Sequence, residues 1–184
     1  LRPDAYPPLL REIPQVPPML TMRGSFPTEG TKYLAVVGSR ALSSYGSAAC
    51  RRLIEGLRGY PISIVSGLAL GADAEAHEAA LSAGLHTIAV PGSGLHDAYI
   101  APRTNLGLAH RILAARGALL SEHPPETSAR PEYFPSRNRI MAGLSHATLM
   151  IEASEKSGTL ITARLAVDYN RELLAVPHRI GDAH

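Results

Sequence analysis

The stretch YLAVVGSR, residues 33–40, decides the fold class of this 184-residue chain. An apolar run, Tyr33–Val37, ends in the turn Gly38-Ser39-Arg40, and a helical pattern follows from Ser43 to about Arg58. A short apolar run that passes through a glycine turn into a helix is typical of a buried strand in a βαβ unit. The stretch therefore predicts the first strand of a parallel sheet.

The same alternation recurs along the chain. Short buried strands that alternate with helices need right-handed crossovers, and they form a mostly parallel sheet. We therefore predict an α/β fold with a doubly wound, extended Rossmann-like sheet, in which ligands bind beyond the carboxyl ends of the strands. Further strands are expected at 62–65, 87–90, 117–120, 147–151 and 172–176, and helices at Ala74–Leu81, Thr104–Arg116 and Thr159–Tyr169.

Residues 1–30 are rich in proline, which fixes φ and removes a backbone donor. We predict that this segment is an extended arm or linker at the domain edge, and that residues 31–184 form the Rossmann-like domain. Apolar side chains would pin the arm to the surface, namely Leu9, Leu10, Ile13, Val16 and Leu20.

Composition excludes several classes of protein. Hydrophobic residues make up 45% of the chain and charged residues 18%, which indicates a globular protein rather than a disordered one. The net charge of +2 means that any basic site is local. The single cysteine, Cys50, fits a cytoplasmic protein, and no apolar run approaches the roughly 20 residues that span a bilayer. The chain lacks an initiator methionine, so we expect it to be part of a longer protein.

Two polar segments give the strongest functional signal. The segment FPSRNRI, residues 134–140, places Arg137 and Arg139 on either side of an asparagine and close to an aromatic ring. Guanidinium groups beside an aromatic face can hold phosphates and stack a base. The turn at residues 157–159 opens another helix, whose N–H groups attract anions. Together they predict a crevice for a nucleic-acid backbone. The alternative is a solvated loop with Phe134 in the core.

Residues 121–138 carry four prolines and are predicted to form a loop. A loop of this length in a compact domain is usually functional. Asp73 and His77 are either an acid–base pair or, as we favour, a helix cap and a histidine that supports a neighbouring loop. Glu152 follows a strand and could serve a hydrolase or orient Arg137 or Arg139. Structural pairing is the favoured interpretation.

Several motifs are absent from the sequence. It contains neither G-x-G-x-x-G nor a P-loop, which argues against dinucleotide and nucleoside-triphosphate sites. The eight histidines are scattered, without H-E-x-x-H or cysteine partners, so we predict no metal and no other cofactor. No G-x-S-x-G elbow supplies a catalytic serine.

Six segments stand in an order that resembles the DNA-processing protein A (DprA/Smf) family and its extended Rossmann-fold core. The resemblance covers about residues 7–180. The segments are GSR (38–40), SGLALGADAEAHEAAL (66–81), TIAVPGSGL (87–95), SEHPP (121–125), FPSRNRIMAGLS (134–145) and EASEKSGTLITARLA (152–166).

The resemblance implies a single-stranded-DNA-binding protein of natural transformation. Such a protein protects incoming strands, displaces single-strand-binding protein and helps to load the RecA recombinase. A homodimer without enzymatic activity is also implied. From the residues themselves we expect Phe134 to anchor the proline-rich loop, and Arg137 and Arg139 to face phosphate or an acidic partner such as Glu152. By position in the motifs, the DNA pocket would contain Gly38, Ser39, Arg40, Arg130, Tyr133, Phe134, Arg137, Asn138, Arg139, Ser157, Gly158 and Thr159.

Two other functions stay open at this point. Nucleoside-monophosphate phosphoribohydrolases resemble the predicted topology and use a glutamate in the crevice, but their P-G-G-x-G-T element is replaced here by Pro91-Gly92-Ser93-Gly94-Leu95. A small nucleotide-sensing module would use the same loops. Tests for free base release and for mononucleotide affinity separate these alternatives from a binder of single strands.

Overall fold

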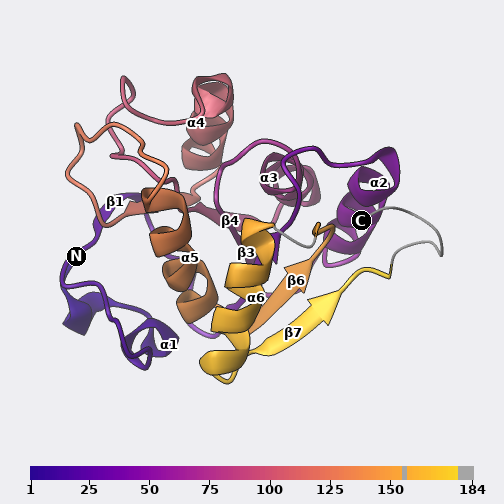
Figure 1. Cartoon of the computed structure of the whole chain (residues 1–184), viewed down its shortest axis with the longest axis horizontal. Helices are drawn as coiled ribbons and strands as arrows, with labels where there is room; N and C mark the ends of the chain where they lie inside the picture. Colours follow the sequence, from indigo (N-terminus) through magenta and orange to yellow (C-terminus); the bar gives the residue numbers. More distant parts are fainter. Residues whose placement is uncertain (155–156, 178–184) are drawn as a thin grey trace.

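A computed structural model describes residues 1–154 and 157–177. The described chain forms one seven-stranded sheet with helices on both faces (Figure 1). The strands are β1 (Thr21–Gly24), β2 (Lys32–Val37), β3 (Ile62–Ser66), β4 (His86–Ala89), β5 (Ala118–Ser121), β6 (Ala147–Met150) and β7 (Glu172–Ala175). The helices are η1 (Pro3–Ala5), α1 (Pro8–Arg11), α2 (Ser44–Glu55), α3 (Ala72–Ala83), η2 (Arg103–Asn105), α4 (Leu106–Ala114), α5 (Tyr133–Leu144) and α6 (Gly158–Asp168).

The strand order confirms the doubly wound α/β prediction. The sheet runs β1-β5-β4-β3-β2-β6-β7, and every neighbouring pair except β1 with β5 is parallel. From β2 the chain builds outward through β3, β4 and β5, and then returns to add β6 on the other side of β2. The direction in which strands are added therefore reverses between β2 and β6. Such a topological switch point is where open α/β sheets bind ligands.

Each face of the sheet has its own core, because neighbouring residues of a strand point to opposite faces. Val37 and Val65 pack with α1 and α5, whereas Val36 and Ile64 pack with α2 and α3. Both faces of the central strands are buried, which explains why their sequences read as continuous apolar runs.

The first thirty residues contribute to the core. Leu10, Ile13 and Leu20 are almost completely buried in the cluster that contains residues of α5. A Cβ at Gly143 of α5 would lie 2.9 Å from Ile13, so the glycine admits this close approach. The segment also supplies β1, an antiparallel edge strand that was not predicted. The division of the chain at residue 30 stays a prediction, and residues 178–184 at its far end lie outside the described part.

One predicted loop is corrected. Helix α5 begins at Tyr133, so the loop that was expected to run to Asn138 ends at about residue 132. Pro135 had favoured a loop, but it lies in the first turn of the helix. Backbone N–H groups of the first turn have no partner within the helix, so proline is tolerated there. Arg137, Asn138 and Arg139 therefore project from a helix.

None of the helices in the described part of the chain is long and apolar enough to cross a membrane.

Candidate functional site

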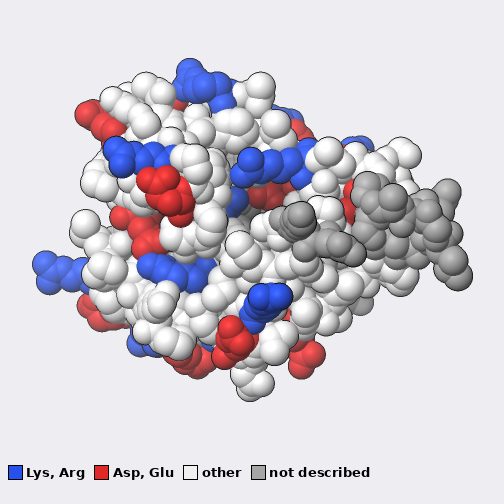
Figure 2. All heavy atoms as spheres, in the orientation of Figure 1, with Lys and Arg blue, Asp and Glu red and all other residues white. Residues whose placement is uncertain are grey.

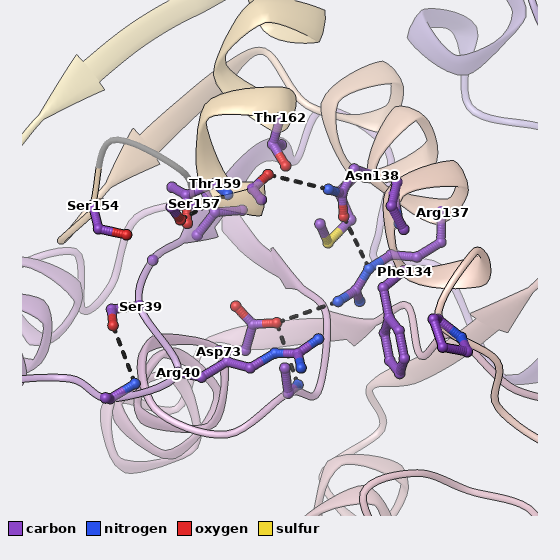
Figure 3. A pocket seen from close by; sticks show the side chains of 18 residues that line it. Ser39, Arg40, Asp73, Phe134, Arg137, Asn138, Ser154, Ser157, Thr159 and Thr162 are labelled. Carbon is purple, nitrogen blue, oxygen red and sulfur yellow. Dashed lines mark hydrogen bonds and ion pairs between the residues drawn. The ribbon is translucent and has the colours of Figure 1, made fainter.

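A cavity of about 640 Å³ opens at the carboxyl edge of the sheet, beside the reversal between β2 and β6 (Figure 3). Four segments form its walls: the turn after β2, the start of α3 with the loop before it, the first turns of α5, and the N-terminus of α6 with the loop before it. It is lined by Val37, Gly38, Ser39, Arg40, Ala41, Ala69, Asp73, Pro131, Phe134, Pro135, Arg137, Asn138, Met141, Ser154, Ser157, Gly158, Thr159 and Thr162.

The turn after β2 supplies the exposed cation of the cavity. A Cβ at Gly38 would lie 2.6 Å from the Cβ of Ala72, so only glycine lets the turn approach α3 this closely. The hydroxyl of Ser39 accepts a hydrogen bond from the backbone N–H of Ala41 at 3.1 Å. The guanidinium carbon of Arg40 stands 4.9 Å from the centre of the Phe134 ring, a cation–π arrangement.

Phe134 lies half-buried between two elements. One face of its ring meets Gly92, where a Cβ would stand 2.9 Å from the ring. Its cavity side carries Arg40. The ring is therefore packed against the loop after β4 and also accessible from the cavity. The prediction that Phe134 serves as an anchor stays untested.

Arg137 differs from Arg40 in its surroundings. Its side chain is only 7% exposed. Its guanidinium donates to the carbonyl of Val90 and, through Nε, to the amide oxygen of Asn138 at 3.1 Å. The Nη2 atom lies 3.6 Å from the carboxylate of Asp73. Gly67 has no side chain, and any Cβ there would overlap this guanidinium. The charge of Arg137 is thus held within the protein wall (Figure 3).

Burial governs the electrostatics of this pair. Desolvation raises the pKa of Asp73, and the charge of Arg137 and the N–H of Ala69 oppose that rise. Desolvation likewise lowers the pKa of Arg137, and Asp73 opposes the change. A guanidinium keeps its proton in proteins even when it is buried. The buried charge of Arg137 therefore requires a counter-charge, which ionised Asp73 supplies.

The N-terminus of α6 closes the cavity. Ser157 caps the helix, and its hydroxyl accepts from the N–H of Thr159 at 3.1 Å. The amide of Asn138 donates to the carbonyl of Gly158 at 3.5 Å, which ties α6 to α5. Buried Thr159 and Thr162 add hydroxyl groups to the wall. A helix N-terminus carries a partial positive charge, so this wall favours an anion.

Nine of the twelve predicted site residues line the cavity, and Arg130, Tyr133 and Arg139 do not. Tyr133 stacks on His123 with ring centres 4.0 Å apart, and the guanidinium of Arg130 stands 5.9 Å from the Tyr133 ring. Arg139 pairs with Glu122 at 2.5 Å. The binding roles assigned to all twelve residues stay predictions.

The interpretation of Asp73 as a helix cap is wrong. Gly71 holds the capping position, and Asp73 lies inside α3, where it pairs with Arg137. The sequence singled out Asp73 but did not indicate that it lines the cavity beside Arg137. The available signal was a carboxylate in the first turn of an alanine-rich helix, directly after the glycine-rich turn that follows β3.

His77 is fully buried, and its Nδ1 lies 2.7 Å from the hydroxyl of Thr87. That hydroxyl gives its own proton to the carbonyl of Ile64 at 2.9 Å, so Nδ1 of His77 must be the donor. His77 therefore has a structural contact, but with strand β4 and not with the neighbouring loop that was predicted.

Glu152 forms a structural contact, although not with the expected arginines. It is 3% exposed and accepts hydrogen bonds from the backbone N–H of Ser43, at 2.9 Å, and from the hydroxyl of the same residue. Arg137 and Arg139 pair with Asp73 and Glu122 instead. The contact fastens the start of α2 to the end of β6.

Among the described residues, the face of the molecule in Figure 2 has no broad basic patch. Lys and Arg side chains are spread over that face with Asp and Glu between them. No group of three or more His, Cys, Asp or Glu side chains in the described residues is arranged to hold a metal ion.

Comparison with known proteins relates the whole chain to one family. The sequence model of DNA recombination-mediator protein A matches residues 1–184. Protein Smf of Escherichia coli is 43% identical over 179 residues, which is 97% of this chain and 47% of the relative. The DNA processing protein DprA of Bacillus subtilis is 39% identical over 181 residues, or 97% of this chain and 60% of the relative. The chain thus spans about half the length of these two curated relatives.

Solved structures agree. The X-ray structure of DprA from Streptococcus pneumoniae superposes with a TM-score of 0.89 at 39% identity, covering 98% of this chain and 62% of that one. A structure of DprA from Helicobacter pylori, described for its single-stranded DNA binding mode, gives 0.85 at 29% identity and covers 97% and 80%. The molybdenum cofactor binding protein of Rippkaea orientalis, 13% identical with a TM-score of 0.59 over 83% and 80% of the two chains, shares the fold alone. The chain belongs to the DNA recombination-mediator protein A family.

Proposed function

We propose that this chain is the single-stranded-DNA-binding part of a recombination mediator, which protects strands that enter during natural transformation and helps to load RecA onto them. One observation carries the proposal: an exposed arginine, an aromatic ring and a helix N-terminus converge on one cavity at the ligand-binding edge of the sheet. The single-stranded DNA binding reported for the Helicobacter pylori relative supports it.

The cavity suits a nucleotide without selecting its sequence. Arg40 and the N–H groups at the start of α6 provide donors for a phosphate, and the half-buried ring of Phe134 provides a face for a base. Every base has such a face, so this contact tolerates any sequence. Arg130 and the Tyr133–His123 stack lie outside the cavity, where a longer strand would reach them after it leaves the site.

Arg40→Ala tests the proposal. Loss of one charge-assisted contact should weaken binding of labelled oligo-dT about five- to tenfold. It should also reduce the slope of log affinity against log salt by about 0.7, the value expected for one phosphate contact on a single strand. Fluorescence anisotropy at several salt concentrations measures both quantities.

Two variants serve as controls for Arg40→Ala. Arg111 is exposed on α4 and pairs with Glu78, so Arg111→Ala changes the net charge equally and should leave binding unchanged. Arg51 of α2 pairs with Glu75 and does not line the cavity, so Arg51→Ala should also leave the salt slope unchanged. Full affinity in Arg40→Ala, or a loss in Arg111→Ala as large as in Arg40→Ala, contradicts the assignment.

We also infer a homodimer, with RecA and single-strand-binding protein as further partners of the longer protein. The support on this chain is exposed apolar side chains on α6 and on both faces of the edge strand β7. Leu173 and Leu174 of β7 are 37% and 48% exposed, and Val167 of α6 is 60% exposed. Strands of a parallel sheet are usually covered on both faces, so this edge is suited to a second copy.

A binding role fits the site better than the hydrolase alternative. That alternative needs a glutamate that reaches a ligand in the crevice. Glu152 is buried, does not line the cavity and accepts two hydrogen bonds from Ser43. The carboxylate that does reach the wall, Asp73, is neutralised by Arg137. Incubation with nucleoside monophosphates is therefore expected to release no free base.

A further inference from the structure

The cavity wall contains more positive than negative side chains. Among the described residues that line the cavity, two are cationic, Arg40 and Arg137, and one is anionic, Asp73. The local charge of this set is therefore +1. Arg40 is exposed, whereas the side chains of Arg137 and Asp73 are 7% and 8% exposed. Glu155 and Lys156, which carry opposite charges, lie outside the described residues.

The anionic member of this set is fixed in place. Asp73 lies in the first turn of α3 and accepts a hydrogen bond from the N–H of Ala69 at 3.3 Å. Arg137, its partner at 3.6 Å, is held independently by Val90 and Asn138. Neither charge can turn away when a ligand enters, so an anion in the cavity meets a carboxylate as well as two guanidiniums.

The effect of this fixed carboxylate on binding depends on how much negative charge the phosphate of the ligand carries. A phosphodiester inside a strand carries one negative charge, and a terminal phosphate monoester carries about −1.5 to −2 at neutral pH. The first negative charge is balanced by Arg40. A second one is left unbalanced, because the attraction of Arg137 is offset by the repulsion of its partner Asp73. Charges act over such distances more strongly in a partly buried wall than in water.

We propose that Asp73 determines ligand specificity in this cavity, by making it accept the monoanionic phosphodiester of a strand interior without favouring the dianionic phosphate of a free nucleotide or a strand end. The proposal rests on the proposed function, because it defines which part of a single strand the site takes. It also gives a chemical reason why cellular mononucleotides would not compete for the site.

Two ligands that differ only in charge test the inference. Thymidine 5′-monophosphate and its methyl ester share base, sugar and phosphate position, but the ester is a monoanion. Competition against labelled oligo-dT, with millimolar competitor at constant ionic strength, gives the ratio of their affinities. The wild-type chain should bind the methyl ester at least as tightly as the monophosphate. A clear preference for the monophosphate, or no competition by either ligand, overturns the proposal.

Asp73→Asn supplies the second arm. Asparagine keeps the size of the side chain and an oxygen for the N–H of Ala69, and Val90 and Asn138 still hold Arg137. The affinity ratio should move about tenfold towards the monophosphate, as expected for removing one nearby carboxylate from a partly screened site. Asp97→Asn is the matched control, since Asp97 pairs with Arg23 and His110 away from the cavity. An unchanged ratio in folded Asp73→Asn overturns the proposal.

The design separates this proposal from the proposed function. If the wild-type chain does not bind oligo-dT, the proposed function fails. If oligo-dT binds and the monophosphate is preferred, only the role of Asp73 fails. If Asp73→Asn does not fold, the wild-type ratio still decides the outcome, because it needs no variant.

Discussion

At the scale of single residues, Gly67 is the position on which the buried charge pair depends most directly. Its missing side chain leaves the space that the guanidinium of Arg137 fills. Gly67→Ala should expel Arg137 and leave Asp73 buried without its partner, at a cost of about 3–5 kcal/mol in the free energy of unfolding. Urea denaturation measures that free energy.

Gly107 provides the control for Gly67→Ala. It lies inside α4, and a Cβ there would meet no atom within 4 Å. Gly107→Ala should therefore stabilise the chain by about 0.5–1 kcal/mol, because alanine is the better helix former. A loss of stability in Gly67→Ala no larger than about 1 kcal/mol would contradict the contact.

His77 should make stability depend on pH. Burial lowers its pKa from 6.5 to about 3. The folded-state pKa thus lies below the unfolded one, so the contribution of neutral His77 is complete above about pH 6.5 and is lost as the pH falls towards 3. The slope is about 1.4 kcal/mol per pH unit in that window.

His77→Asn should remove this slope, because asparagine can still donate to Thr87 but does not titrate. Urea unfolding at a series of pH values between 7 and 4 measures the difference between variant and wild type. His96→Gln, at an exposed position, is the control and should follow the wild-type curve. Parallel curves for wild type and His77→Asn would show that the buried imidazole does not titrate in this range.

At the scale of elements, α5 shows where prediction from sequence succeeds and where it fails. The apolar residues Ile140, Met141 and Leu144 indicate a helix, but Pro135 in its first turn reads as a loop signal. The two arginines were assigned to one crevice because they are close in sequence. Residues two apart on a helix point about 200° apart, so Arg137 faces the cavity and Arg139 faces Glu122.

Strands were predicted where the sequence is a continuous apolar run, including the exposed edge strand β7. Parallel strands with two covered faces, such as β2 and β3, are continuous apolar runs and were found within a residue or two. β1 was missed because its sequence, TMRG, is short and only partly buried. The carboxyl-edge position of the site followed from the topology. The pairing of Asp73 with Arg137 did not, because α3 and α5 lie far apart in sequence.

The edge formed by α6 and β7 yields a prediction about assembly. Leu174 is 48% exposed on an edge strand that has a neighbour on one side only. If this edge meets a second copy, Leu174→Glu should shift the chain from dimer to monomer by placing a charge in an apolar interface. Sedimentation velocity at micromolar concentration measures the change.

Met19→Glu gives the matched control, since Met19 is 60% exposed and precedes β1, the strand at the opposite edge of the sheet. It should leave the sedimentation coefficient unchanged. A monomeric wild-type chain, or a dimer that tolerates Leu174→Glu, would place the assembly surface elsewhere.

At the scale of the whole molecule, contacts join the N-terminal segment to the chain that follows α6. The guanidinium of Arg171, after α6, donates to the carbonyl of Leu9 at 2.9 Å and pairs with Glu12 at 3.1 Å. The backbone nitrogen of Leu1 donates to the carbonyl of Leu20 at 2.5 Å. The proline-rich segment therefore closes one face of the sheet, which its composition alone did not indicate.

The cavity also has a consequence for how the chain folds. Its walls come from residues 37–41, from Ala69 and Asp73, and from residues 131–154 and 157–162, so about ninety positions separate the first of these segments from the next large one. Contacts of such separation form late, after the entropy of closing the intervening loop has been spent. A growing chain that has completed β2 to β5 would hold most of the sheet and still have no site. A ligand could then bind only after the last third of the chain has folded onto the sheet. Its binding would stabilise the contacts between the turn after β2 and this last third, because a ligand that binds only the folded chain favours that state.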